Sequence, residues 1–424
     1  MAKIIKKEPI INVGIILPND QKTEIIIDVP NPSNYTINSE SLSKKLIVKC
    51  QSESILINNI LANKFIIEPI EDLDKNEFPI INSVPTGRGF HWQNEIQVRL
   101  PGKIIIQNYN GFLFVINKLP SEEYLPYVAT SEMNADCPTA LLEAQTIAAR
   151  SWLLANRKVN HPKLNIDVCN DDCCQRYQGV TGVSDKSLQA IQKTFGQILL
   201  SDNEICAARY SKCCGGITES FENVWGGKPI LYLSSISDFS HNNNQTDDLL
   251  NFLNSSPPAF CSEKFVKPSD IKKYLGKVDK SDSYYRWDIT YSQNELTSTI
   301  NQKLDLEATG IVNISPLKRG YSGRITKLKI DYIDKFDKNK SIILFSEYDI
   351  RNALYKQFLY SSAIIIEQKP QTDSLPEKFK FIGAGWGHGV GLCQIGALGM
   401  ALNGYTAVDI LQHYFKNTKI EKIY

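Results

Sequence analysis

The chain has 424 residues, of which 42% are hydrophobic and 22% are charged, and its 47 Lys and Arg against 46 Asp and Glu give a net charge of +1. This composition is ordinary for a globular protein with a hydrophobic core. At roughly 150 residues per domain the length predicts two or three domains, or else one large fold with insertions. Because the charges balance and no long basic run occurs, we expect no nucleic-acid partner.

The N-terminus contains one short apolar run, from Ile10 to Leu17, which includes Asn12 and ends at Pro18. This run is too short and too polar for a signal peptide or a membrane span. We therefore expect no transmembrane segment in this chain and see no signal peptide. The sequence leaves open whether the protein stays in the cytoplasm or has lost a leader.

Residues 1 to about 120 are predicted to be rich in β-strands. Their short segments of β-branched residues, separated by Asn, Asp, Pro and Gly, include IINVGIIL, KKLIVKC and GKIIIQNY. Asn110-Gly111, between two apolar runs, predicts a β-hairpin. No catalytic pattern is visible, so we expect a structural module or a substrate platform, with residues 1–90 as an N-terminal β-rich region.

Helical patterns begin after residue 121. Pro138, followed by TALLEAQTIAARSW, predicts a helix over about 138–156, and a second helix is predicted near 185–197. The Asn- and Asp-rich stretch that follows predicts a variable surface insertion over about 239–285.

Mixed strands and helices return after this insertion, with EYDIRNALY predicted as a short helix. Thr406 is the predicted N-cap of a final amphipathic helix, with Asp409 at the capping-box position. Together these elements predict an α+β fold with loop insertions.

Two glutamates near the first predicted helix are candidate acids. Glu132 precedes that helix, and Glu143 lies within it. A carboxylate on a loop held by a rigid scaffold is a common catalytic arrangement. On composition alone, each is more often an ordinary surface residue.

A glycine-rich segment, GWGHGVGLCQIG at 385–396, surrounds Trp386, His388 and Gln394. Such glycine density permits positive φ and close approach of the backbone to a ligand. The segment lacks the Gly-Lys-Ser/Thr ending of a phosphate loop and the context of a dinucleotide fingerprint. A tryptophan here suits stacking on a sugar ring. The alternative is a buried turn in which the histidine is only a hydrogen-bonding partner.

Three cysteines lie close together in CNDDCCQRYQG: Cys169, Cys173 and Cys174, with His161 a few residues upstream. Thiolates and an imidazole at this spacing can converge on Zn²⁺, and Cys213 and Cys214 offer further ligands. A disulfide, for instance between Cys174 and Cys214, and plain buried thiols remain open alternatives.

Several blocks, in this order, resemble the stage II sporulation protein D (SpoIID/LytB) family. They are SEEYLPYVATSEM with ALLEAQTIAARSW, DVCNDDCCQRYQG, ARYSKCCGGITESFENVWGG and GAGWGHGVGLCQIGALGMALNGY. The resemblance covers about residues 90–424. It implies a SpoIID-like catalytic domain over 91–424 and action on bacterial peptidoglycan outside the cytoplasm.

The family includes lytic transglycosylases that cut glycan strands stripped of peptides, and proteins described as enhancers of a cell-wall amidase. By resemblance, the catalytic glutamate maps onto Glu132. A structural zinc ion near the Cys-Gln-x-Tyr block maps onto Cys169 and Cys174, with Cys173 where a histidine is often found. The substrate-site residues implied are Tyr124, Gln175, Tyr177, Trp386, His388 and Gln394.

The resemblance implies glycan strands as substrate, with a cell-wall amidase as a further partner. In a lytic cleavage one glutamate serves as acid and then as base, so Glu132 has to be protonated at first. For Arg150 a structural role is favoured over binding of a substrate carboxylate. The rival hypotheses are a non-catalytic activator of an amidase and a zinc hydrolase. The hydrolase is disfavoured because no His-Glu-x-x-His element is present.

Overall fold

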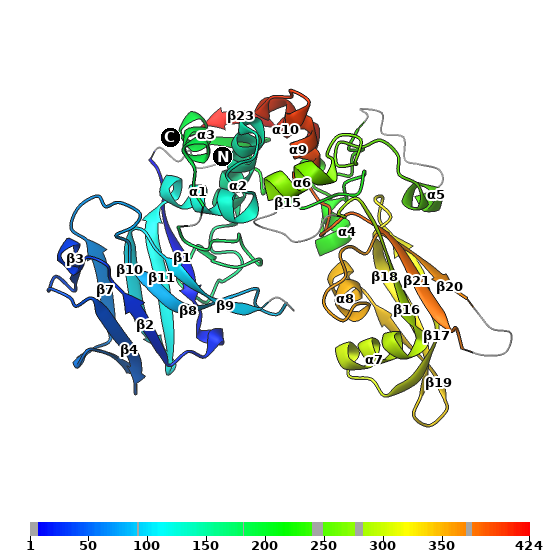
Figure 1. Cartoon of the computed structure of the whole chain (residues 1–424), viewed down its shortest axis with the longest axis horizontal. Helices are drawn as coiled ribbons and strands as arrows, with labels where there is room; N and C mark the ends of the chain where they lie inside the picture. Colours follow the sequence, from blue (N-terminus) through cyan, green and yellow to red (C-terminus); the bar gives the residue numbers. More distant parts are fainter. Residues whose placement is uncertain (1–6, 91–92, 181, 240–248, 276–282, 370–374) are drawn as a thin grey trace. The chain divides into compact units, whose positions relative to one another are not determined.

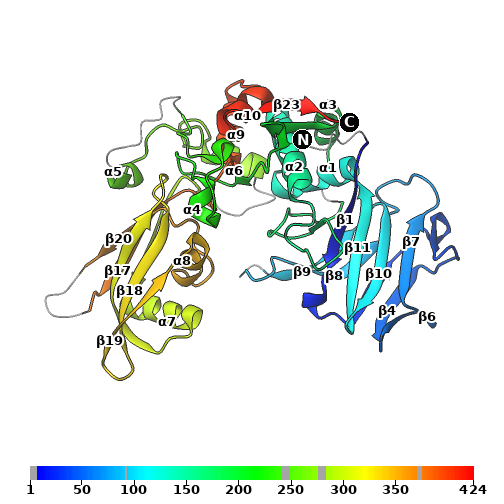
Figure 2. The same ribbon diagram turned by 180° about the vertical axis from the view of Figure 1, so that it is seen from behind.

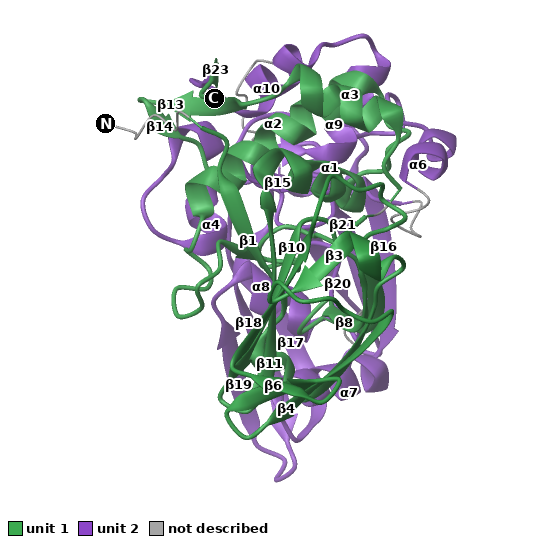
Figure 3. Cartoon of the chain, turned by 90° about the vertical axis from the view of Figure 1, so that its left-hand side faces the viewer, with its two compact units in different colours: residues 1–207, 420–424 green, residues 208–419 purple. Residues whose placement is uncertain are grey.

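The computed structural model describes residues 7–90, 93–180, 182–239, 249–275, 283–369 and 375–424 (Figures 1 and 2). The chain divides into two compact units, residues 1–207 with 420–424, and residues 208–419 (Figure 3). Unit 1 opens with β-sheets and continues with helices, and unit 2 mixes strands and helices, so the predicted α+β class is confirmed. No helix in the described ranges is both long and apolar enough to cross a membrane.

Unit 1 contains two six-stranded sheets, with strand orders β12-β1-β11-β10-β7-β3 and β6-β5-β4-β2-β8-β9. Most strands alternate buried and partly exposed residues, as expected when one face of a sheet covers the core. The strands before the first helix are β1 (Ile10–Ile16), β2 (Glu24–Asp28), β3 (Tyr35–Ile37), β4 (Lys45–Gln51), β5 (Ser54–Ile57), β6 (Ile60–Ala62), β7 (Lys64–Pro69), β8 (Ile80–Thr86), β9 (Asn94–Arg99), β10 (Lys103–Tyr109) and β11 (Phe112–Pro120).

The predicted hairpin joins β10 to β11. Tyr109 pairs with Phe112, which leaves Asn110 and Gly111 as a two-residue loop. Both loop residues have positive φ, 52° and 87°, as a type I′ turn requires. The prediction from the Asn-Gly pair is therefore confirmed.

The expected limit of the N-terminal region near residue 90 falls between β8 and β9, and these two strands pair with each other. In the other sheet, β1 pairs with β11, and β7 pairs with β10. Strands from before and after residue 90 thus share both sheets. The extent of the SpoIID-like domain over 91–424 remains a prediction.

The helical part of unit 1 follows the sheets. Its elements are α1 (Ser121–Glu132), α2 (Thr139–Asn156), β12 (Val168–Cys169), α3 (Asp185–Lys193), β13 (Gln197–Ser201), β14 (Glu204–Ile205) and β23 (Lys419–Lys422). The helix predicted from Pro138 is confirmed as α2. The helix predicted over 185–197 is shorter at its end, because the chain turns after Lys193 and enters β13 at Gln197.

Helix α1 was not predicted. Pro126 lies inside it and has no N–H for an intrahelical bond, which disfavours a helix. Tyr124, Leu125 and Val128 are nevertheless fully buried in this helix. Burial of these side chains outweighs the local cost, since tertiary packing commonly overrides helix propensity.

The described residues of unit 2 form three small sheets, with orders β16-β21-β20, β17-β18-β19 and β15-β22. The predicted helix in EYDIRNALY is confirmed as α8, and Thr406 caps α10 in the predicted capping box with Asp409. The elements are β15 (Tyr210–Ser211), α4 (Phe221–Trp225), α5 (Leu249–Asn254), α6 (Pro268–Leu275), β16 (Arg286–Ser292), α7 (Gln293–Leu304), β17 (Ala308–Arg319), β18 (Ile325–Asp334), β19 (Asn339–Leu344), α8 (Glu347–Ala353), β20 (Ile364–Gln368), β21 (Lys378–Ala384), β22 (Leu392–Cys393), α9 (Gln394–Leu402) and α10 (Ala407–Tyr414).

The predicted insertion over about 239–285 lies partly outside the described residues, which omit 240–248 and 276–282. Its described part is folded into α5, a segment with buried Phe260 and Cys261, and α6.

Candidate functional site

Glu132 is the last residue of α1, and the turn to α2 follows it directly. The Arg176 amide N–H donates to its Oε1 at 3.3 Å, and the Gln178 amide donates to the hydroxyl of the preceding Ser131 at 3.4 Å. The end of α1 therefore lies against the segment that follows the cysteine cluster.

That segment is fixed by Gln175 and Tyr177. The side-chain amide nitrogen of Gln175 donates to the Ala149 carbonyl in α2 at 3.1 Å. The Tyr124 hydroxyl donates to Oε1 of the same side chain at 3.4 Å. The Tyr177 hydroxyl donates to Asn117 Oδ1 at 2.8 Å, and burial raises the pKa of Tyr177, which keeps this donor protonated.

Tyr124, Gln175 and Tyr177 are 0%, 1% and 0% exposed, and the two tyrosine rings lie 4.9 Å apart. These three predicted substrate-site residues are therefore buried in unit 1, between α1 and the segment that contacts Glu132. A direct contact with a sugar would require this packing to open. In the described structure they hold the loop that contacts Glu132.

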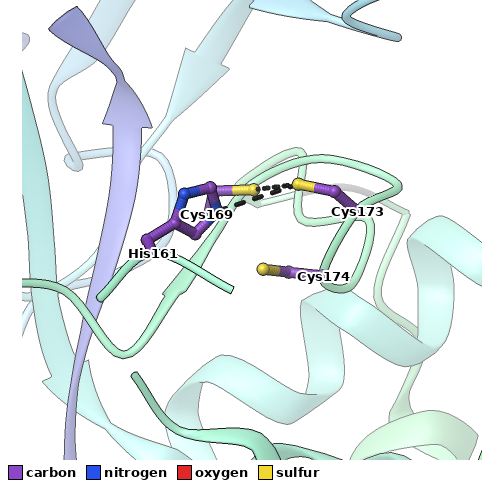
Figure 4. A group of neighbouring side chains, drawn as sticks. All are labelled: His161, Cys169, Cys173 and Cys174. Atoms are coloured by element: carbon purple, nitrogen blue, oxygen red, sulfur yellow. Dashed lines mark hydrogen bonds between the residues drawn. The ribbon is translucent and has the colours of Figure 1, made fainter. Parts of the chain in front are cut away.

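His161, Cys169, Cys173 and Cys174 converge in unit 1, as Figure 4 shows. Their ligand atoms all lie within 4.8 Å of one another. The Cys169 and Cys173 sulfurs are 3.1 Å apart, and Cys173 Sγ lies 3.7 Å from His161 Nε2. Cys169 is placed by the pairing of β12 with β1.

Hydrogen bonding from the Cys169 and Cys173 thiols holds the pKa of Cys174 well below its usual range. Three soft sulfur ligands and one imidazole in this geometry could hold a metal ion. None of the ten cysteines, all of which lie among the described residues, forms a disulfide in the structure. The three cysteines predicted from spacing thus come together, and the upstream histidine completes the group.

Arg150 is fully buried in α2. Its guanidinium forms two hydrogen bonds with the Glu122 carboxylate, at 2.7 and 2.6 Å, and a third with the Gln197 carbonyl at 3.0 Å. These contacts bear out the structural role favoured for Arg150. Glu143, the other candidate acid, instead forms an ion pair with Lys193 at 2.8 Å.

Trp386, His388 and Gln394 belong to unit 2. The Trp386 indole stacks on Tyr360 with 4.2 Å between centroids and contacts the edge of Tyr284 at 5.0 Å. Gln394 is the first residue of α9 and is 2% exposed. Both side chains are thus engaged in the packing of their own unit.

His388 lies among cations and an aromatic ring. Its Nδ1 accepts from the Val390 amide at 3.0 Å, and its ring meets that of Trp225 at 4.9 Å. Burial lowers the pKa of His388 well below its ordinary value of 6.5, and the charges of Arg209, Arg324 and Arg351 lower it further. The imidazole is therefore neutral, with Nε2 as its N–H donor.

A pH prediction follows from His388. Because its pKa is lower in the folded protein, the unfolded chain binds one more proton below pH 6.5, so stability is lost as the pH falls. In the natural protein this proton lowers the free energy of unfolding by up to about 1.4 kcal/mol for each pH unit below 6.5, and we expect this contribution to be absent in His388→Gln. Urea denaturation of both proteins between pH 7.5 and 5.5 checks it, and parallel curves would contradict it.

Trp225 is a further candidate for ligand binding that the sequence reasoning did not select. It ends α4, is 42% exposed, and lies with its ring 4.0 Å from the Arg209 guanidinium. An indole that is held from one side and exposed on another suits stacking on a sugar. The signal available was a tryptophan followed by two glycines, Gly226 and Gly227, both with positive φ.

Two family models match different parts of the chain. A model of the family "Stage II sporulation protein" matches residues 109–200, which include Glu132 and the cysteine cluster. A model described as "Domain of unknown function (DUF8618)" matches residues 219–391, which include Trp225 and His388.

Curated relatives were also found, among them the following three. An uncharacterized protein of Brachyspira hyodysenteriae is 27% identical over 400 residues, 93% of this chain and 91% of the relative. Stage II sporulation protein D of Bacillus subtilis is 25% identical over 324 residues, 72% of this chain and 76% of the relative. The amidase enhancer of Bacillus subtilis is 23% identical over 303 residues, 69% of this chain but only 39% of the relative. These matches confirm the resemblance predicted from the sequence.

Proposed function

We propose that this chain, which contains a SpoIID domain and is a distant homologue of stage II sporulation protein D and of the amidase enhancer, is a lytic transglycosylase of peptidoglycan. Its substrate is the glycan strand, cut between N-acetylmuramic acid and N-acetylglucosamine. The observation that carries the proposal is the position of Glu132 within the matched domain, at the end of α1 and against the loop that follows the cysteine cluster.

The reaction needs a single carboxyl group. Protonated Glu132 gives its proton to the glycosidic oxygen, and the bond from that oxygen to C1 of the muramic acid breaks. The resulting carboxylate removes the proton from the C6 hydroxyl of the same sugar, whose oxygen bonds to C1. The products are a free 4-hydroxyl on one fragment and a 1,6-anhydro ring on the other, and no water is consumed.

The surroundings of Glu132 suit both protonation states. A helix C-terminus carries partial negative charge, which favours the neutral acid at the start of the reaction. After proton donation, the Arg176 amide is a hydrogen-bond donor to the carboxylate. Tyr124, Gln175 and Tyr177 are positioning residues because they hold the Arg176 amide in place.

His161, Cys169, Cys173 and Cys174 fit a zinc ion. Zinc there would be structural: a four-ligand tetrahedral site is closed and has no open position for substrate. Zinc would affect catalysis only indirectly, by fixing the backbone at Cys174, which is two residues from the Arg176 amide that contacts Glu132. In unit 2, Trp225 is proposed to stack on the glycan, and His388, whose ring contacts that of Trp225, is proposed to hold the indole in place. Trp386 and Gln394 are packed within unit 2 and are proposed to support this segment without touching the glycan.

A prediction follows for this cluster. We expect Cys174→Ser to remove one zinc ion per chain and to lower the melting temperature of unit 1 by about 10 °C, since each kcal/mol lost corresponds to about 2–4 °C for a unit of this size. Zinc analysis and calorimetry measure both. Cys206→Ser, a buried cysteine outside the cluster, is the control. Unchanged zinc content with an unchanged melting curve would contradict the assignment.

The amidase enhancer among the relatives favours a second candidate, a non-catalytic activator of a cell-wall amidase. An assay with peptide-free glycan strands separates the two. The purified full chain, with no amidase present, is expected to release soluble glycan fragments. If it binds these strands without releasing fragments and instead speeds an amidase on intact peptidoglycan, the second candidate holds. Either role places the protein at the cell wall, outside the cytoplasm.

A further inference from the structure

A second group of ionisable side chains is enclosed in unit 2: Cys214, Asp238, Cys261 and Cys393. They are 2%, 0%, 3% and 0% exposed, and their ligand atoms all lie within 4.8 Å of one another. The four residues come from separate segments that span nearly the whole unit. The carboxylate is the unusual member of this group, because aspartate is rarely fully buried in a protein core and a buried negative charge costs free energy unless it is paired.

Backbone pairing brings two of the cysteines together. In the parallel pair of β15 with β22, Ser211 lies opposite Cys393, and Cys214 follows three residues later. The Cys214 amide donates to Cys393 Sγ at 3.1 Å, and the Gly396 amide donates to the same sulfur at 3.3 Å. Cys393 is thus the N-cap of α9, where amide donors and the helix dipole stabilise a thiolate.

Two hydrogen bonds fix the orientation of the Asp238 carboxylate. Its Oδ2 accepts from the Cys261 amide at 2.8 Å, and its Oδ1 accepts from the Tyr414 hydroxyl at 2.5 Å. A Cβ on Gly396 would lie 2.1 Å from the Tyr414 hydroxyl and 2.6 Å from Asp238 Oδ1, so only glycine lets α9 approach this pair. Among the residues that the structure describes, no cationic side chain forms a salt bridge with Asp238.

The distances fit a shared ion better than a covalent bond. The Cys214 and Cys261 sulfurs are 3.7 Å apart. Two thiolates on a tetrahedral Zn²⁺ with Zn–S bonds of about 2.3 Å are separated by about 3.8 Å. Bonded disulfide sulfurs lie about 2.05 Å apart. A divalent cation would also supply the positive charge that stabilises the ionised forms of these buried thiols and of the carboxyl group.

We propose that Cys214, Cys261, Cys393 and Asp238 bind one Zn²⁺ in a closed structural site of unit 2. The site is separate from the His161 cluster of unit 1 and takes no part in the proposed cleavage. It joins the β15–β22 pair, the start of α9 and the segment before α6, and so ties the predicted insertion to the glycine-rich segment. Cys213 is also buried and lies beside Cys261 and Cys393, but it is outside this ligand set.

The test measures metal in the full-length chain with the first cluster removed. The double variant Cys173→Ser, Cys174→Ser, purified under reducing conditions without chelator, is expected to retain one zinc ion per chain. X-ray absorption at the zinc edge should show three sulfur neighbours and one oxygen. Adding Cys261→Ser should remove this ion, whereas adding Cys213→Ser should leave it.

Several results would overturn the site. They are a double variant without zinc, iron in place of zinc, or, in protein purified without reductant, an intact mass lower by about 2 Da for each disulfide. If Cys261→Ser prevents folding, the spectrum of the double variant alone decides between zinc and the alternatives. Because no substrate is used, the outcome is independent of whether the chain cleaves glycan.

Discussion

Glu132→Gln is expected to lower the rate of cleavage of peptide-free glycan strands by about 10²–10⁴-fold, the usual contribution of a positioned general acid. Glutamine has nearly the same shape and can still accept from the Arg176 amide. It can neither give a proton to the glycosidic oxygen nor take one from the C6 hydroxyl. The loss should therefore appear in kcat, with little change in glycan binding.

Glu143→Gln is the matched control for this variant. It removes a glutamate from the neighbouring helix α2, whose partner Lys193 is 72% exposed, so little stability or activity should be lost. Thermal unfolding of both variants should match that of the natural protein. Wild-type turnover by Glu132→Gln would rule out the assignment of the catalytic acid.

Glu122→Gln is expected to lower the free energy of unfolding of unit 1 by about 3–5 kcal/mol. The Arg150 guanidinium is 0% exposed and the Glu122 side chain 9%, and the pair shares two short hydrogen bonds. Tyr424, from the end of the chain, donates to the same carboxylate at 2.6 Å. Removing the negative charge leaves a buried guanidinium without compensation, so the cost exceeds that of the lost hydrogen bonds.

The double variant Glu122→Gln, Arg150→Met tests this reason for the loss. Replacing the arginine removes the uncompensated charge, so part of the lost stability should return. Urea denaturation of the single variants, the double variant and Glu143→Gln measures the four values. If the free energy of unfolding of Glu122→Gln stays within about 1 kcal/mol of that of the natural protein, the pair contributes no more than an exposed ion pair, and the prediction is wrong.

Local signals in the sequence predicted a good part of the fold. Pro138 marked the start of α2, Asn110-Gly111 marked a two-residue hairpin, and Thr406 with Asp409 marked the cap of α10. In each case a few adjacent residues determine the backbone conformation, so no knowledge of distant contacts is needed. The spacing of Cys169, Cys173 and Cys174 was informative for the same reason.

Features that depend on distant contacts were missed. Helix α1 contains Pro126 and is stabilised by burial, which propensity does not reveal. The buried positions of Tyr124 and Tyr177 arise from packing between α1 and the loop after the cysteines. The second cluster was invisible because Cys214 and Cys393 lie 179 positions apart and meet only through the β15–β22 pair.

The most direct test of the proposed function is mass spectrometry of the fragments that the full chain releases from peptide-free glycan strands. A lytic transglycosylase leaves 1,6-anhydro-muramic acid at the fragment ends, and we expect these ends with the natural protein and their loss with Glu132→Gln. Fragments with ordinary reducing ends, each heavier by one water molecule, would contradict the account, because they would show hydrolysis and a second carboxylate that activates water.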